Sequence, residues 1–96
     1  MYIACVHGQS ACVQLLLDKG ADFNAETSFH HTPLHAATLH GREDIVKMLL
    51  RKGADCNART DYGHTPLHDA CLHGHQGIVE LLLDRYETDR VPLKTT

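Results

Sequence analysis

Thr-Pro-Leu-His stands at residues 32–35 and returns unchanged at residues 65–68. The hexapeptide Gly-Ala-Asp-Phe-Asn-Ala at residues 20–25 likewise returns as Gly-Ala-Asp-Cys-Asn-Ala at residues 53–58, again 33 residues later. A fixed period of this length is typical of stacked units, each of which completes its core against its neighbours. The sequence therefore predicts an extended array with a concave surface, which favours binding over chemistry in a deep cleft.

Within each period the motifs follow one order: Thr-Pro-Leu-His, two small residues, a glycine, an aliphatic helix, and Gly-Ala-Asp-x-Asn-Ala. This order resembles the ankyrin repeat over residues 1 to about 86. The resemblance implies an all-α repeat solenoid of stacked helix-turn-helix ankyrin repeats with projecting β-hairpin loops. It also implies a protein-binding scaffold, since families built this way mostly bind proteins and share no catalytic activity.

The repeat alignment divides the chain into a partial repeat with the helix pair only, two full repeats and a C-terminal tail. These parts are residues 1–20, 21–53, 54–86 and 87–96. The tail is expected because Tyr86 stands where Gly20 and Gly53 follow the earlier outer helices, so the last helix lacks a glycine stop. The first repeat keeps core-type residues instead of a polar outer face. This predicts either a longer repeat protein or self-association through the uncapped N-terminal repeat.

Each repeat predicts a short inner helix and a longer outer helix. Thr32 and Thr65 fit the N-cap, where a hydroxyl accepts a hydrogen bond from a helix N–H, and a proline follows at the first helical position. His30 stands where the next loop has Gly63, so we expect a positive φ and some strain there. The expected inner helices are 2–7, 33–40 and 66–73, and the expected outer helices are 10–19, 43–52 and 76–85.

The composition excludes several classes of function. The 96 residues carry a net charge of −3 with mixed signs and no basic stripe, so we expect no direct nucleic-acid partner. No apolar run approaches the roughly 18 residues of a membrane span, and the N-terminus lacks the features of a signal peptide. The cysteines lack the paired spacing of a disulfide framework or a zinc site. We expect all four as buried thiols in a reducing compartment, cytoplasmic or nuclear: Cys5, Cys12, Cys56 and Cys71.

Nine histidines raise the question of a metal site. His35 and His68 belong to the repeat motif, and we expect a ring nitrogen of each to bond a nearby hydroxyl or backbone group. In the ankyrin family this residue ties the helix start to the neighbouring loop. His7, His40 and His73 form a ladder at the ends of the inner helices, which pack roughly 8–10 Å apart, too far to share one zinc ion.

A nucleophile built from Cys71, His68 and Asp69 is the strongest catalytic alternative. We disfavour it, because the thiol is expected to be buried and the carboxylate leaves the helix at a different angle. The sequence also lacks a phosphate-binding glycine-rich loop and a cleft with paired carboxylates. We therefore expect no enzyme activity, no metal and no cofactor.

Ankyrin proteins usually hold their partners with the hairpin tips and the exposed side of the inner helices. Carried over residue by residue, the resemblance implies tip and groove positions that bind protein. These are Ser28, Phe29, His31, Asp61, Tyr62 and His64 in the tips, and Leu39, His40, Asp69, Leu72 and His73 in the groove. Aromatic residues on exposed tips are typical interface anchors; the alternative is that both rings fold back against the adjacent loop.

Asp69 lies four residues before His73 on one helical face, so we expect its carboxylate to favour the protonated form of that imidazole. With the rest of the ladder, this would make the groove more cationic as the pH falls and favour an acidic peptide in mild acid.

The leading function is an adaptor that binds a protein or peptide partner. One alternative is a regulatory or substrate-receptor module of a larger enzyme complex, since residues 11–17 and 20–22 resemble receptors of cullin ubiquitin ligases, although the recruiting box is absent. A purely structural or oligomer-forming unit is the other alternative.

Overall fold

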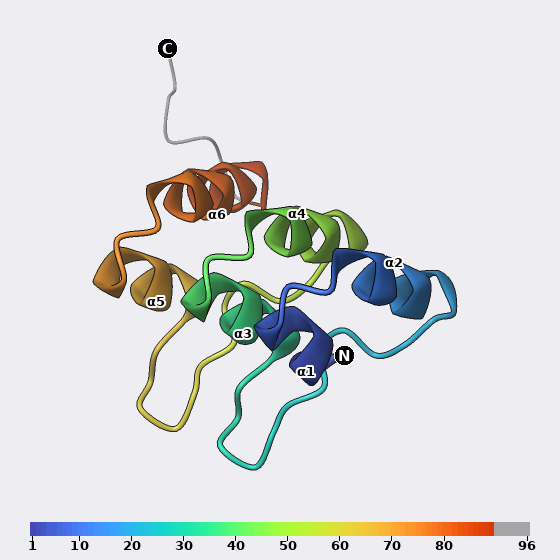
Figure 1. Ribbon diagram of the computed structural model, residues 1–96. Helices are drawn as coiled ribbons and strands as arrows, with labels where there is room; N and C mark the ends of the chain where they lie inside the picture. The colour runs from blue at the N-terminus through green and yellow to red at the C-terminus, as the bar shows by residue number, and fades with distance from the viewer. Residues whose placement is uncertain (90–96) are drawn as a thin grey trace.

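The structure, a computed structural model, describes residues 1–89, which form six helices in two layers (Figure 1). The inner layer consists of α1 (Tyr2–Val6), α3 (Pro33–Leu39) and α5 (Pro66–Leu72), and the outer layer of α2 (Ser10–Asp18), α4 (Glu43–Lys52) and α6 (Gln76–Asp89). Each inner helix packs against the outer helix of its own unit and against the inner helix of the next. The predicted all-α repeat solenoid is confirmed.

The core lies between the two layers, where each outer helix turns its aliphatic stripe inward. Leu34 of α3 is fully buried, as are Ile45 and Leu49 of α4 and Ile78 and Leu82 of α6. Burying one such side chain contributes roughly 1.5–3 kcal/mol, far more than the intrinsic helix propensity of one residue. The central unit, which is covered on both sides, contributes more of these buried side chains than either neighbouring unit.

The predicted helix starts are confirmed in both full repeats. The Thr32 hydroxyl accepts from the backbone N–H of His35, and the Thr65 hydroxyl accepts from the N–H of His68, with a proline at the first helical position each time. The outer helix α4 ends where predicted, at Gly53, whose φ of 94° lies in the left-handed region that glycine tolerates.

Neighbouring units are tied together at equivalent positions. The guanidinium of Arg42 donates from Nε and Nη2 to the carbonyl of Val6, at 3.2 and 3.0 Å. One repeat later, His75 Nε2 donates to the carbonyl of Leu39 at 3.3 Å. Both bonds satisfy a carbonyl at the end of the preceding inner helix, where the helix itself supplies no partner.

Two predictions about the chain's outline need correction. The last helix, α6, continues to Asp89 instead of ending near residue 85, because residue 86 is not the glycine that stops α4. The first three residues of the predicted tail, 87–89, are thus helical, and the other tail residues lie outside the described part. Between residues 1 and 89 the loops also contain no strand, since each loop closes with only one or two bonds around its turn.

The prediction that all four cysteines are buried is wrong for two of them. Cys5 and Cys56 are buried, but Cys12 and Cys71 are exposed. Cys71 occupies the position of the fully buried Thr38, which α5 covers, whereas no further inner helix covers α5 in the described residues. Cys12 is equivalent to Ile45, which is buried in a unit whose outer helix packs against the preceding outer helix, α2. No outer helix precedes α2 in the described residues, so Cys12 stays exposed.

Candidate functional site

The two loops that follow α2 and α4 project beyond the inner layer and end in similar turns (Figure 1). In the first turn, the N–H of Thr27 donates to the carbonyl of His31 at 2.9 Å, and in the second, Thr60 donates to His64 at 3.0 Å. His30 has the predicted positive φ, 64°. The two tips therefore share one backbone design although their sequences differ.

Both tip aromatics are exposed, Phe29 by 64% and Tyr62 by 82%. These values contradict the alternative that the rings fold back against their loops. The tips also touch, because the N–H of Asp61 donates to the carbonyl of Phe29 at 3.1 Å. Ser28 is exposed beside them, and together these residues present two aromatic rings on adjacent, connected tips.

A histidine lies between two carboxylates at the junction of the tips. His30 Nδ1 is 2.8 Å from Glu26 Oε1 in its own loop, and Nε2 is 3.5 Å from Asp61 Oδ1 in the next loop. The bond to Glu26 and the charge of Asp61 raise the pKa of His30 above the usual value of a histidine. The sequence indicated the unusual backbone of His30 but not these two partners.

Asp69 was predicted to be exposed in the groove, which is wrong, and its observed partner is His64 instead of the expected His73. Its side chain is buried, with Oδ1 3.4 Å from His64 Nδ1 at the base of the second tip. The ring of His64 also stacks on His68, with centroids 3.9 Å apart and planes 15° apart. A buried carboxylate needs a partner, and His64 provides it from the loop before α5.

The structural role predicted for the motif histidines is confirmed for His35. Its ring is fully buried, with Nδ1 2.9 Å from the Thr32 hydroxyl and Nε2 3.0 Å from the carbonyl of His64 in the next loop. Since a carbonyl only accepts, Nε2 carries the proton of a neutral ring. Burial, the largest effect, lowers the pKa of His35, although the bond to His64 acts in the opposite direction. His68 is exposed instead, because no further loop reaches it in the described residues.

The predicted groove positions are only partly exposed. His40 and His73 are exposed, as is Leu72 by 64%, whereas Leu39 and the tip residue His31 are half-buried. The equivalent groove positions Leu39 and Leu72 thus differ in exposure. α3 packs against α5, whereas no further inner helix follows α5 in the described residues.

Sequence reasoning missed a shallow depression on the exposed side of α5. It has a volume of about 530 Å³, and its lining is Thr65, Leu67, His68, Cys71 and Leu72. Two of these residues, His68 and Cys71, have fully buried equivalents in the central unit, His35 and Thr38. The sequence contains a signal for this surface: no further Thr-Pro-Leu-His motif follows residues 65–68, so no further inner helix is expected to cover α5.

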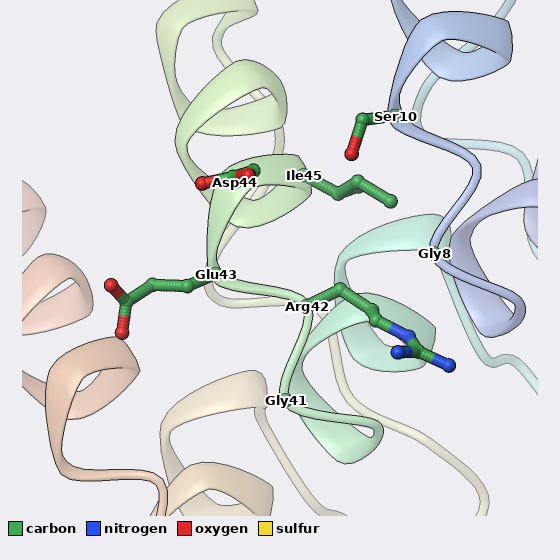
Figure 2. Close-up of a pocket in the computed structure, with 7 residues that line it drawn as sticks. All are labelled: Gly8, Ser10, Gly41, Arg42, Glu43, Asp44 and Ile45. Carbon is green, nitrogen blue, oxygen red and sulfur yellow. The ribbon is translucent and has the colours of Figure 1, made fainter.

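A second depression, of about 320 Å³, lies at the turns of the first two units (Figure 2). Figure 2 shows Arg42 and Glu43 pointing in opposite directions. The guanidinium is already bonded to Val6, and the carboxylate lies against Gly77 of α6, so close that a Cβ there would clash with it. Both charged groups thus serve the packing of the repeats and are not directed at a ligand.

The described residues do not assemble the catalytic or metal sites weighed above. Asp69 contacts His64, and no recorded hydrogen bond or ion pair joins the Cys71 thiol to His68 or Asp69. Residues 1–89 contain no group of three or more His, Cys, Asp or Glu side chains placed to hold a metal ion. Within residues 1–89 the helices lack the length and the run of apolar residues that a membrane span requires.

A sequence model of ankyrin repeats, in three copies, matches residues 1–91, which include all of the helices described above. No curated protein matches the chain. The division into repeats at residues 20, 53 and 86 stays a prediction, as does the binding role of the tip and groove residues.

Proposed function

The chain belongs to the ankyrin repeat family, and from this premise we propose that it is a non-catalytic adaptor that binds a protein or peptide. Ankyrin repeats are generally protein–protein interaction modules. The proposed contact surface, which we call the tip–groove face, consists of the loop tips and the C-terminal ends of α3 and α5 with the histidine that follows each helix. It comprises Ser28, Phe29, His31, Asp61, Tyr62 and His64, with Leu39, His40, Leu72 and His73.

The observation that carries this proposal is the exposure of Phe29 and Tyr62 on connected tips. An aromatic side chain buries roughly 150–250 Å² when a partner covers it, and its two side-chain torsions cost little entropy to fix. Both rings lie outside the hydrophobic core, so their burial does not stabilise the fold of the free protein. Leu72, at the end of α5, is a further exposed apolar side chain among the proposed contact residues.

Peptide-display selection on the immobilised protein tests the proposal even while the partner is unidentified. We expect wild type to select peptides that the Phe29→Ala/Tyr62→Ala variant does not retain. Each ring should contribute on the order of 1–3 kcal/mol to binding, as interface anchors do. Circular dichroism of the variant should match wild type, since neither ring is part of the core.

Leu15→Ala is a matched control, because Leu15 is an apolar residue of α2 that is 58% exposed and remote from the tips. The selected peptide should bind this control like wild type. Equal binding to wild type and to the tip variant would contradict the assignment of the tip–groove face. Equal loss in the control and in the tip variant would indicate binding through general hydrophobic contact instead.

We also propose that the first repeat supports self-association. Ile3 of α1 is 71% exposed and Cys12 of α2 is exposed, whereas the equivalent Ala36 and Ile45 of the next unit are buried. A second copy could cover this apolar end. Light scattering over a concentration series should show a mass increase that Ile3→Lys abolishes, and a constant monomer mass for wild type would refute the idea.

A cytoplasmic or nuclear location is supported by the cysteines, none of which forms a disulfide in the described residues. A role as a regulatory or substrate-receptor module of a larger complex, such as a ubiquitin ligase, would use the same tip–groove face. The peptides retained by wild type and lost by the tip variant would then represent the recruited substrate.

A further inference from the structure

The ring of His30 is the one side-chain link between the two tips recorded for residues 1–89, and its geometry depends on a proton. A neutral imidazole has one N–H, so it donates to Glu26 or to Asp61 but not to both. A protonated ring has two N–H groups and a positive charge, which fit a carboxylate on each side. The contact with Glu26 is a short hydrogen bond at 2.8 Å, and the contact with Asp61, at 3.5 Å, is a looser ion pair.

We propose that His30 is a positioning residue of the tip–groove face: its protonated ring links the two tips and fixes Phe29 and Tyr62 as one paired surface. This inference rests on the proposed function, which supplies the reason for pairing the two rings. His30 directly follows Phe29 in the chain, and Asp61 directly precedes Tyr62. The link therefore acts on the backbone next to both aromatic residues.

The link adds to a contact that exists already. At the tips themselves, the N–H of Asp61 donates to the carbonyl of Phe29. Nearer their bases the loops are joined by the Asp55 N–H, which donates to Asn24 Oδ1, and by His35 Nε2, which bonds the carbonyl of His64. The link through His30 adds a side-chain contact beside the backbone bond at the tips, where the two aromatic residues lie, and so restricts the tips further. The second loop has Gly63 at the position of His30, so a glycine suffices for the turn itself. The turn therefore does not require an imidazole. The contacts of the ring with the two carboxylates give the histidine side chain a role that glycine cannot fill.

Glu26 and Asp61 are the charged groups that face the ring from the two loops packed around it. His31, the next residue, turns its ring towards His35 instead. Both carboxylates favour the protonated form, which agrees with the raised pKa of His30. The link is therefore fully present below the pKa of an unfolded histidine, about 6.5, and is lost as the pH rises through the higher pKa of the folded protein.

The expected effect is small, because all three side chains are largely exposed to solvent. Exposed ion pairs change an equilibrium by roughly twofold to fivefold. Such a factor is too small to matter for folding, but it suffices to change how often two loop tips adopt one arrangement. The inference thus concerns the preorganisation of a surface and not the stability of the fold.

The first test uses the free protein and nuclear magnetic resonance. The titration midpoint of His30 should fall in Asp61→Asn relative to wild type. It should not move in Asp44→Asn, which removes the same charge from an exposed site at the start of α4. An equal midpoint in wild type and Asp61→Asn would overturn the inference, because the ring would then not sense the second tip.

The second test measures hydrogen exchange of the Asp61 amide, which donates across the tips. Its protection factor in wild type should be roughly twofold to fivefold higher at pH 5.5 than at pH 8.5. In His30→Gly, which keeps the turn of Gly63, the protection factor should be the same at both values. A pH-independent protection factor in wild type would overturn the proposed link.

The third test uses the peptide selected above and compares affinities at the two pH values. The ratio of wild-type affinity to His30→Gly affinity should be higher at pH 5.5, since ionisation of the peptide itself cancels in the ratio. A constant ratio would show that His30 does not position the binding surface. The proposed function fails separately, if the tip variant binds the peptide like wild type, so the two failures are distinguishable.

Discussion

Replacing His35 by alanine is the perturbation whose effect the structure predicts most fully. The buried ring bonds the Thr32 hydroxyl at 2.9 Å, the Thr32 N–H at 3.2 Å and the carbonyl of His64 at 3.0 Å. At about 1 kcal/mol net for each bond, their loss costs about 3 kcal/mol, and the orphaned carbonyl and lost packing increase this. A domain of this kind is stable by only about 5–15 kcal/mol, so the loss is a large fraction.

His68→Ala is the matched control, because His68 has the same place in the Thr-Pro-Leu-His motif. Its ring is exposed and its recorded ring contact is the stacking on His64, which is worth about 0.5–1 kcal/mol. Urea denaturation followed by circular dichroism measures both variants. With a slope of about 1 kcal/mol per molar urea, the midpoint should fall by about 3 M for His35→Ala and by less than about 1 M for His68→Ala.

Similar losses in the two variants would show that the motif itself, and not the neighbouring unit, decides how much this histidine stabilises the fold. His35→Gln, which keeps one polar contact to the next loop, should lie between His35→Ala and wild type. This milder variant keeps the comparison measurable if His35→Ala does not fold.

Three further predictions follow from single residues. Thr38→Val should raise the free energy of unfolding by about 1 kcal/mol in urea titrations, since the Thr38 hydroxyl is buried without a hydrogen-bond partner; a loss of stability would contradict this. An aromatic disulfide reagent at pH 8 should label Cys71 and Cys12 rapidly and Cys5 slowly, because burial raises the pKa of the Cys5 thiol to about 11. Rapid labelling of Cys5 in the native protein would contradict this prediction. The urea midpoint should fall as the pH drops below about 6.5, because the unfolded chain binds a proton at His35 that the folded chain resists; an unchanged slope in His35→Gln would exclude this histidine as the cause.

The starts and ends of the helices were predictable from the sequence, because residues within one helical turn decide them. The threonine caps, the prolines that follow them and the glycine at the end of α4 act within one helical turn, and each stands where the repeat placed it. The positive φ of His30 was predictable for the same reason, since the equivalent Gly63 marks the backbone conformation.

The environment of equivalent residues was not predictable in the same way, because it depends on what lies beside the unit. Cys71 and Thr38 share a position, yet one is exposed and the other is buried, since only Thr38 has a following inner helix. Asp69 is buried beside His64, at the base of the second tip. The spacing of residues along α5 could not reveal this partner, because His64 lies in the loop before the helix. The bridging of Glu26 and Asp61 by His30 was missed likewise, as it joins two loops.

Calorimetric titration of the selected peptide into wild type and into Phe29→Ala/Tyr62→Ala at pH 7.5 tests directly whether the exposed tip aromatics form the binding surface. The Kd should rise by at least about thirtyfold in the double variant, because two anchors of about 1 kcal/mol or more each contribute about 2 kcal/mol or more, while the circular dichroism spectrum stays that of wild type. An unchanged Kd in a folded double variant would show that the exposed tip aromatics do not form the binding surface.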